Sequence, residues 1–272
     1  MPGKPTAGET KRSELHARVQ SQFGAAAAAY TTSLVHSDPN ALRRVVELAQ
    51  PKPGDAALDI ATGAGHTALA LAPHVASVVA FDVTEKMLAE TARNAADRGL
   101  TNVSTRRGMA EDLPFADASF DIVTVRHAPH HYGDAPRAVR EMARVARPGA
   151  RVIVVDSTAP EDASLAARWN HIEKLRDPSH VQNYTPTEWR EMIAGAGLRI
   201  FCEETDFCTE NGEPMDFHAW VKRSNTPPAD VEELARLFRE ADAGLASALR
   251  IRIEGDAIRF CVPQVTFGSI KE

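Results

Sequence analysis

The sequence predicts an α/β protein with a mostly parallel sheet of seven strands and helices on both of its faces. Short apolar runs of strand length alternate with amphipathic runs of helix length over residues 55–156. A glycine-rich turn follows the first of these strands and opens a helix, and Gly or Pro follows several later helices, as at Gly99, Pro148 and Gly197. Strands and helices that take turns in this way are typical of a parallel sheet covered on both faces.

Each expected strand is a short run of mainly apolar or β-branched residues between turn signals. We expect strands at residues 57–60, 77–81, 102–106, 120–125, 151–156, 198–208 and 260–267. The expected helices repeat their apolar residues three or four positions apart. We expect helices at residues 40–49, 66–72, 85–98, 136–146, 188–196, 214–223 and 229–248. Asp38 or Asn40 is suited to cap the first of these helices.

Two helical segments lie outside this alternation. One is an N-terminal helix expected over residues 14–30, after a flexible tail at residues 1–14 that is rich in Pro, Gly, Lys and Thr. The other is a polar, mostly helical insert at residues 160–183, after the fifth strand. We therefore expect the tail to be followed by one domain over residues 15–272.

The charge and composition exclude several classes of function. The 31 basic and 37 acidic side chains give a formal net charge of -6, so we expect no basic face for nucleic acid. No run is long and apolar enough to span a bilayer, and the N-terminus has no apolar signal-peptide core. Cys202, Cys208 and Cys261 lack metal-ligand spacing and are expected to be reduced. We therefore expect a cytoplasmic protein.

The turn at Gly63 and Gly65 is the first candidate ligand site. Glycine lets the backbone pass close to a ligand with a positive φ, and the helix start offers N–H groups. The pattern leaves three interpretations open: a plain strand-to-helix turn, a dinucleotide site, because residues 63–68 formally fit GxGxxA, or a site for another nucleoside. A GxG pattern alone does not decide between them.

Two acidic residues at strand ends narrow this choice. Asp59 lies on the strand just before the turn, where a carboxylate would repel a pyrophosphate but would suit a cationic ligand, such as the amino group or sulfonium of S-adenosylmethionine. Asp82 ends the next strand, 19 residues after Gly63, where its carboxylate can accept hydrogen bonds from both ribose hydroxyls. Asp82 therefore indicates a nucleoside, and Asp59 favours S-adenosylmethionine over a dinucleotide.

These residues belong to a larger pattern. Residues 108–115 read GMAEDLPF, the strand after them begins SFDIV, and residues 147–150 read RPGA. Together with the glycine turn and Asp82, this pattern resembles the class I S-adenosylmethionine-dependent methyltransferases, most closely the UbiE-like (methyltransferase type 11) branch. The resemblance covers about residues 23–156. It implies a Rossmann-like fold and transfer of the methyl group of S-adenosylmethionine to a small molecule.

The resemblance implies roles for the matching residues. Asp59 would face the methionine amino group, Asp82 would hold the ribose, and Arg126 would sit beside the methyl group. The residues expected to bind the cofactor are Asp59, Ala61, Gly63, Gly65, Asp82, Val83, Met87, Met109, Ala110, Glu111 and Arg126. These residues fall within an expected cofactor-binding core at about residues 40–156.

The adenine end of the expected site departs from the family at one position. Val83 and Met87 would flank the ring, and the backbone N–H of Ala110 would bind a ring nitrogen. The family often has Asp where this chain has Met109, to accept a hydrogen bond from the adenine amino group. Here that contact is left to the acidic pair at residues 111–112.

A histidine-rich loop, with the sequence RHAPHHY at residues 126–132, follows the fourth strand. Loops at the carboxyl ends of parallel strands form the ligand crevice, and an imidazole can accept a proton at neutral pH. His130 is the first candidate for a general base and His127 the second, because His127 could instead contact the cofactor. A structural role for His130 and His131 is the simpler interpretation. We expect no metal, because an activated sulfonium needs none.

The acceptor side of the site is less well defined by the sequence. The insert would form a substrate lid at about residues 157–190, whereas residues 198–272 form the C-terminal part. The residues expected on the substrate side are Phe23, Tyr30, His131, Trp169, His180 and Tyr184. Trp169 and Tyr184 suit an apolar pocket, and packing of the same aromatic side chains in a core explains them as well.

The acceptor itself is not named by the sequence. The resemblance favours a quinone or another aromatic or natural-product intermediate, and it leaves open whether carbon, oxygen, nitrogen or sulfur receives the methyl group. Two other functions remain as alternatives: a protein that binds S-adenosylmethionine without transferring its methyl group, and an NAD-dependent enzyme. The expected partner is a small-molecule acceptor, and the sequence leaves open whether the chain forms a homodimer.

Overall fold

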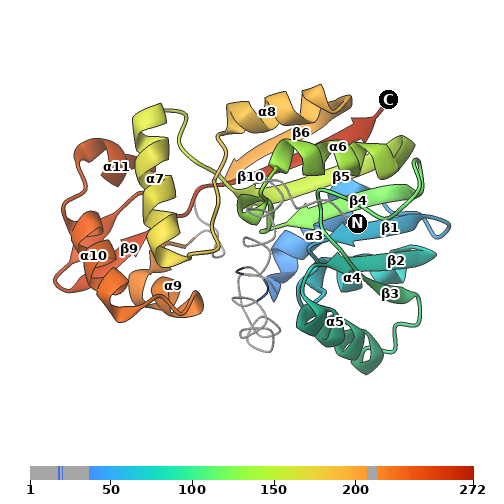
Figure 1. The fold of residues 1–272 in the computed structure, drawn as a ribbon, viewed down its shortest axis with the longest axis horizontal. Coiled ribbons are helices and arrows are strands. Elements are labelled where there is room, and N and C mark those ends of the chain that lie inside the picture. The colour runs from blue at the N-terminus through green and yellow to red at the C-terminus, as the bar shows by residue number, and fades with distance from the viewer. Residues whose placement is uncertain (1–17, 19, 21–36, 207–212) are drawn as a thin grey trace, which may run out of the picture.

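The computed structural model describes residues 18, 20, 37–206 and 213–272, and a seven-stranded sheet lies at its centre (Figure 1). In sheet order the strands are β3 (Val103–Arg107), β2 (Ser77–Asp82), β1 (Ala56–Ile60), β4 (Phe120–Arg126), β5 (Ala146–Ser157), β10 (Gln264–Lys271) and β6 (Leu198–Asp206). Neighbouring strands from β3 to β5 are parallel, whereas β10 is antiparallel to β5 and β6. The expected mostly parallel sheet of seven strands is confirmed.

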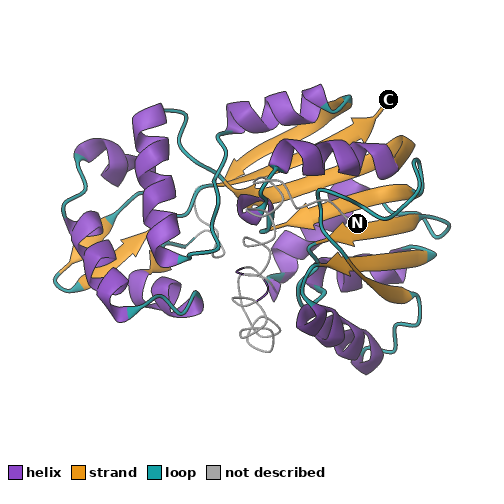
Figure 2. Ribbon diagram, viewed as in Figure 1, coloured by secondary structure: helices purple, strands orange, loops and turns teal. Residues whose placement is uncertain are grey.

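Helices cover both faces of this sheet (Figures 1 and 2). They are α3 (Pro39–Ala49), α4 (His66–Leu71), α5 (Glu85–Asp97), α6 (Ala135–Val145) and α8 (Pro186–Gly195). Helices α3 and α4 share a core with strand residues such as Ala57 and Ile153, whereas α6 and α8 share another core with Leu58 and Val152. Neighbouring residues of a strand face opposite sides of the sheet, and both sides are buried. Each of these strands is therefore a continuous run of apolar residues.

Capping residues place several helix ends close to where the sequence predicts them. Asp38, one of the two expected caps, accepts a hydrogen bond from the backbone N–H of Asn40 at 2.9 Å. Thr185 and Glu188 form a reciprocal capping box at the start of α8. Both arrangements pair N–H groups that the first helical turn leaves without helical partners. The N-terminal helix expected over residues 14–30 falls almost entirely outside the described residues.

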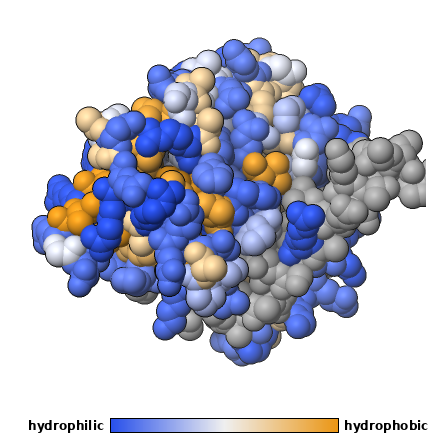
Figure 3. All heavy atoms as spheres, turned by 60° about the vertical axis from the view of Figure 1, so that its left-hand side comes forward, coloured by the Kyte–Doolittle hydropathy of each residue, from blue (hydrophilic) through white to orange (hydrophobic). Residues whose placement is uncertain are grey.

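The chain builds a second unit beyond the sheet, here called the outer lobe, from helix α7 and residues 213–262 (Figure 1). Its elements are α7 (Ala163–Arg176), β7 (Met215–Asp216), α9 (Phe217–Arg223), α10 (Pro228–Arg239), α11 (Ala243–Ala248), β8 (Arg252–Glu254) and β9 (Ala257–Phe260). The lobe has its own core, in which the rings of Trp220 and Phe238 lie 4.9 and 4.6 Å from that of Phe260. The side of the molecule that carries this lobe is mainly hydrophilic at its surface, with groups of apolar residues between the hydrophilic ones (Figure 3).

The helices and strands predicted from the sequence differ most from the observed ones in the outer lobe. Residues 215–216 form strand β7 and not the start of a helix, and the helix expected over residues 229–248 is broken at Asp242, which caps α11. The strand expected over residues 260–267 is in fact two strands in two sheets, because β9 pairs with β7 and β8 whereas β10 joins the main sheet. These pairings join distant segments, so local periodicity does not reveal them.

Two further expectations can be compared with the structure. Cys202 has a free thiol, whereas Cys261 is disulfide-bonded, so the expectation that all three cysteines are reduced is wrong for Cys261. Within the part of the chain that the structure describes, no helix is long and apolar enough to cross a membrane. Strand β5 also begins earlier than expected, because residues 147–150 continue the strand directly after α6.

The packing of Trp169 gives the first testable prediction. Its side chain is fully buried in the core of the outer lobe, with its ring 6.2 Å from that of Trp220 and 6.5 Å from that of Phe260. Truncating a buried aromatic side chain costs about 3–5 kcal/mol. We therefore expect Trp169→Ala to lower the free energy of unfolding by that amount in chemical denaturation, and Trp169→Phe to lower it less. A loss below about 1 kcal/mol for the alanine variant would contradict a packing role.

Candidate cofactor and acceptor site

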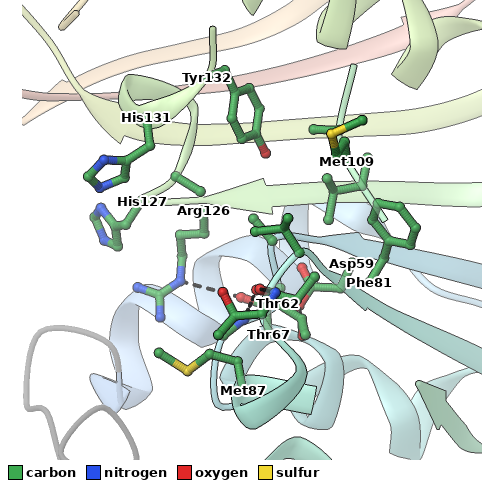
Figure 4. Close-up of a pocket in the computed structure, with 18 of the residues that line it drawn as sticks. Asp59, Thr62, Thr67, Phe81, Met87, Met109, Arg126, His127, His131 and Tyr132 are labelled. Carbon is green, nitrogen blue, oxygen red and sulfur yellow. Dashed lines mark hydrogen bonds between the residues drawn. The ribbon is translucent and has the colours of Figure 1, made fainter. Parts of the chain in front are cut away.

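A pocket opens at the carboxyl ends of β1, β2 and β4, where the ligand crevice is expected (Figure 4). The empty space at this position, including the part that is open to solvent, is about 980 Å³. Of the residues expected to bind the cofactor, all line this pocket except Gly65. Of the described residues expected in catalysis or on the acceptor side, only His127 and His131 line it.

The glycine turn has one residue that opens onto the pocket and one that packs away from it. Gly63 has a φ of +56°, and a Cβ built there would meet no atom within 4 Å, so this side of the turn can lie against a ligand. Gly65 has a φ of +90°, and a Cβ there would lie 2.7 Å from Cγ2 of Thr91 on α5. Gly65 therefore allows the turn to approach α5 closely, and it acts on the site through that packing.

The carboxylate of Asp59 is buried at the floor of the pocket and is held from three directions. Its Oδ2 accepts hydrogen bonds from the Thr62 hydroxyl at 2.6 Å and from the backbone N–H of Ala68 at 3.2 Å, and its Oδ1 accepts one from the Thr124 hydroxyl at 2.7 Å. Burial raises the pKa of Asp59 to about 6, although these hydrogen bonds and the charge of Arg126 oppose the rise. The site thus keeps an acid whose charge becomes more stable when a cation lies beside it.

Asp82 fixes the end of β2 to the glycine turn. One carboxylate oxygen accepts a hydrogen bond from the backbone N–H of Gly63 at 3.0 Å, and the other accepts one from the N–H of Thr84 at 2.8 Å. Burial raises the pKa of Asp82, and these backbone hydrogen bonds oppose the rise. Asp82 lines the pocket, so its carboxylate is placed to accept a diol at the pocket wall.

The segment after β3 forms the opposite wall. Met109 pairs with Asp112 through a backbone bridge, and its side chain remains partly exposed at the pocket. Glu111 is buried and accepts a hydrogen bond from the backbone N–H of Gly133 at 3.0 Å. Of the two acidic residues left to bind the adenine amino group, Glu111 lines the pocket and Asp112 does not. Glu111 also ties this wall to the loop that leads into α6.

Arg126 and His127 form the end of the pocket at the tip of β4 (Figure 4). Arg126 Nε donates to the Thr67 hydroxyl at 3.4 Å, and burial lowers the pKa of Arg126 to about 10 despite the opposing charge of Asp59. His127 has a φ of +53° while its N–H donates to the Val155 carbonyl at 2.8 Å. A left-handed conformation in a residue other than Gly stores strain and is often found at functional sites.

His130, the first candidate for a general base, is not among the residues that line the pocket. It belongs to the short 3₁₀ helix η2 (Pro129–His131), and its Nδ1 lies 2.6 Å from Oδ1 of Asp156 at the end of β5. The charge of Asp156 raises the pKa of His130, although burial opposes this. The imidazole of His130 contacts that of His131 in a tilted arrangement, with ring centroids 4.1 Å apart and an angle of 49° between the ring planes.

His131 does line the pocket, and a second carboxylate fixes its orientation. Its Nδ1 lies 3.2 Å from the Ser179 hydroxyl, which donates to Oδ1 of Asp177 at 2.6 Å. Because the hydroxyl has one hydrogen, it donates to Asp177 and can only accept from His131, so Nδ1 of His131 carries the proton. Burial and the neighbouring His130 lower the pKa of His131 to about 3. The neutral ring therefore presents Nε2 as its proton-accepting atom.

The remaining residues predicted for the acceptor side lie elsewhere. Trp169 packs in the outer lobe, and His180 is buried with its Nε2 3.0 Å from Oδ1 of Asn170. Tyr184 packs against Trp189 with ring centroids 5.8 Å apart. None of these three lines the cofactor pocket. The structure supports the packing interpretation for Trp169, whereas Tyr184 lines a separate surface pocket between α6 and α8. Phe23 and Tyr30 lie outside the described residues.

The pocket also contains residues that the sequence analysis did not single out for binding. They are Ile60, Thr62, Ala64, His66, Thr67, Phe81, Thr84, Gly108, Ala128 and Tyr132. Most are sequence neighbours of predicted residues, so the signal for them was proximity to the motifs. Tyr132 ends the histidine-rich loop, but nothing in the sequence separates a tyrosine that faces a ligand from one that only packs.

The pocket suits the cofactor that the resemblance implies. S-adenosylmethionine has a ribose diol, an apolar purine and a cationic methionine part. The pocket provides the Asp82 carboxylate for a diol, apolar side chains such as Phe81 and Met87, and the buried acid Asp59 near the open side of Gly63. Among the described residues, no group of three or more His, Cys, Asp or Glu side chains could hold a metal ion.

Comparisons with known proteins point to one kind of enzyme. A family model described as a methyltransferase domain matches residues 58–154. The uncharacterized methyltransferase YcgJ of Bacillus subtilis (strain 168) is 34% identical over 254 residues, which are 93% of this chain and 98% of that protein. The crystal structure of YcgJ matches with a TM-score of 0.79 over 86% of this chain and 98% of the other.

Two further proteins extend this comparison. The crystal structure of a putative methyltransferase from Bacillus halodurans C-125 is 30% identical and has a TM-score of 0.80 over 85% of this chain and 98% of that one. A demethylmenaquinone methyltransferase of Halalkalibacterium halodurans is 36% identical over 110 residues, which are 39% of this chain and 45% of that protein. These matches decide between the two nucleoside interpretations of the glycine turn, in favour of S-adenosylmethionine.

The raised pKa of Asp59 predicts how ligand affinity depends on pH. A cationic ligand needs Asp59 ionised, and its pKa of about 6 leaves much of it protonated below that pH. We expect the affinity for S-adenosylhomocysteine, whose amino group is positive, to rise between pH 5 and pH 7 and then level off, by at most about tenfold per unit. Calorimetry across this range measures the change. Asp59→Asn is the control, and the same pH profile in this variant would contradict the assignment.

Proposed function

We propose an acceptor chemistry for this chain from the premise that it belongs to the class I S-adenosylmethionine-dependent methyltransferases. S-adenosylmethionine is its cofactor, and methyl transfer is its reaction. We propose that the acceptor is a small aromatic molecule of the quinol or phenol type that binds beside His127 and His131. The observation that carries this proposal is the position of these two imidazoles at the tip of β4, in a pocket with apolar side chains.

The cofactor side of the pocket is proposed to work through charge and shape. Asp82 would accept the ribose hydroxyls while its hydrogen bond to Gly63 keeps the turn in place. Asp59 and its hydrogen-bonded neighbours would provide the negative field for the methionine part. The Met109 side chain would cover the adenine edge, and Glu111 would be the acidic residue nearest to its amino group. These roles suit a ligand that is cationic at one end and apolar at the other.

When bound, S-adenosylmethionine supplies a methyl group on a sulfonium that is already activated, so orientation of the nucleophile provides much of the rate. The chain must then position the acceptor and receive its proton. His131 is neutral and held by Ser179, which suits it to accept a hydrogen bond from an acceptor hydroxyl. His127 is proposed as the proton acceptor, and His130 as a positioning residue that fixes His131 through the contact between their rings.

An aromatic acceptor is supported by one comparison, because the apolar side chains Phe81 and Met87 are already assigned to the purine of the cofactor. The demethylmenaquinone methyltransferase that resembles part of this chain is named for a quinone-type acceptor. The match covers less than half of either protein, so the acceptor class is our proposal and does not follow from the family.

The test is transfer of a labelled methyl group from S-adenosylmethionine to a panel of hydroquinones, phenols, amines and thiols. We expect product from the hydroquinones or phenols. If His127 is the general base, His127→Ala should lower kcat by about 10²–10⁴-fold, whereas His131→Asn should mainly raise KM. His130→Ala should have the smallest effect on kcat, because its ring does not line the pocket.

Two results would contradict this account. Product from amines or thiols alone would overturn the acceptor class. Tight cofactor binding with no product from any acceptor would favour a protein that binds S-adenosylmethionine without transferring its methyl group. If His130→Ala lost more activity than both other variants, the base would be assigned to His130, the first candidate from the sequence.

A further inference from the structure

Tyr132 has a buried hydroxyl for which the structure provides no partner. The residue follows η2, is 8% exposed, and packs its ring in the main core together with residues such as Ala110 and Ala135. Its hydroxyl oxygen is inaccessible to solvent and accepts or donates no hydrogen bond within the described chain. A buried hydroxyl without a partner loses its bonds to water and gains none in return, so it is retained at a cost in stability.

This hydroxyl differs from the other buried polar atoms that lack a partner. The others belong to Trp169, His180, Asn183 and Trp189, and none of these four lines the cofactor pocket. Tyr132 does line it, and Figure 4 shows its hydroxyl directed into the pocket, on the side of Met109 and across from Asp59. The unpaired oxygen is therefore directed toward the space that a bound ligand would occupy, and it lies just beneath the wall of the pocket.

The surroundings keep the hydroxyl protonated. Burial raises the pKa of Tyr132 well above its ordinary value, and the charges of Glu111, Asp156 and Asp82 raise it further. The phenol thus stays protonated throughout the physiological range and can donate its hydrogen. Among these acids, Glu111 raises the pKa of Tyr132 most. It belongs to the wall that faces the adenine end of the expected ligand.

We propose that the Tyr132 hydroxyl donates a hydrogen bond to an acceptor atom in the adenosine part of S-adenosylmethionine and has no partner until the cofactor binds. The proposal rests on the cofactor assignment and not on the proposed acceptor. Adenosine offers ring nitrogens and ribose oxygens, which are acceptors, and the acidic side chains around the pocket cannot donate when ionised. Packing alone would be satisfied by Phe at this position, since the ring contacts are those of an apolar core.

The test is Tyr132→Phe, which removes only the hydroxyl. We expect the ligand-free variant to melt at the same temperature as the wild type or higher, because an unpaired buried polar group is lost. The affinity for S-adenosylhomocysteine, measured by calorimetry, should fall by about 3- to 10-fold, as for one hydrogen bond. The rise in melting temperature at saturating ligand should shrink accordingly.

A second ligand and a control variant sharpen this test. 5′-Methylthioadenosine lacks the amino-acid part, so the same fold-loss with this ligand is expected if the contact is to adenosine. Tyr184→Phe is the matched control, because Tyr184 packs near the same core but does not line the pocket. Its affinity for both ligands should equal that of the wild type.

Three outcomes would overturn the proposal. Wild-type affinity of Tyr132→Phe for S-adenosylhomocysteine would show that the hydroxyl does not bind the cofactor, and a raised KM for the acceptor with that result would assign it to the acceptor instead. A loss with S-adenosylhomocysteine but not with methylthioadenosine would move the contact to the methionine part. A marked loss of melting temperature in the ligand-free variant would make the hydroxyl structural. Failure of methyl transfer in the wild type leaves all of these binding measurements valid.

Discussion

The site depends on two buried carboxylates that join neighbouring strands at the carboxyl edge of the sheet. Asp82 on β2 holds the backbone N–H of Gly63 in the turn after β1, and Asp59 on β1 holds the hydroxyl of Thr124 on β4. Both acids are almost completely buried, which raises the pKa of each. Burying two acids near each other is unfavourable unless donors and a positive charge compensate them. The pocket thus has the electrostatics of a site that binds a cationic ligand.

The first half of the chain could be predicted from the sequence because its signals are local. Strands β1, β2 and β4 and the glycine turn lie within short, strongly patterned segments, so their positions follow from local rules. The residues expected to bind the cofactor lie at the ends of those strands, and all but Gly65 line the pocket. Gly65 is at the expected place in the turn, but its contact with Thr91 depends on how α5 packs, which sequence spacing does not reveal.

The second half was harder to predict because its contacts are not local. Strand β9 pairs with β7 more than forty residues away, and β10 leaves the outer lobe to insert between β5 and β6. The aromatic side chains there, including Trp169 and Trp220, suit a pocket or a core equally well by type, and only the structure shows that they fill a core. The sequence correctly places the histidine loop after β4. It does not reveal that His131 lines the pocket whereas its neighbour His130 does not.

The cofactor pocket and the aromatic core of the outer lobe lie in different parts of the protein. The sheet and its carboxyl edge supply the cofactor pocket, and the outer lobe buries its aromatic side chains in a separate core. A polar network links them: Nδ1 of His130 contacts Asp156 and Ser157 of β5, Ser157 donates to Asn183, and Asn170 of α7 donates to the Asn183 carbonyl. The segment from α7 to α8 therefore reaches the pocket through Ser179 and its contact with His131.

The measurement that tests this account most directly is a crystal structure of the protein with bound S-adenosylhomocysteine. The account predicts that the ligand occupies the pocket at the ends of β1, β2 and β4, with its ribose hydroxyls on Asp82 and its sulfur toward Arg126 and His127. A ligand bound elsewhere, or bound here with its ribose away from Asp82, would contradict the central claim that the two buried carboxylates organise the cofactor site.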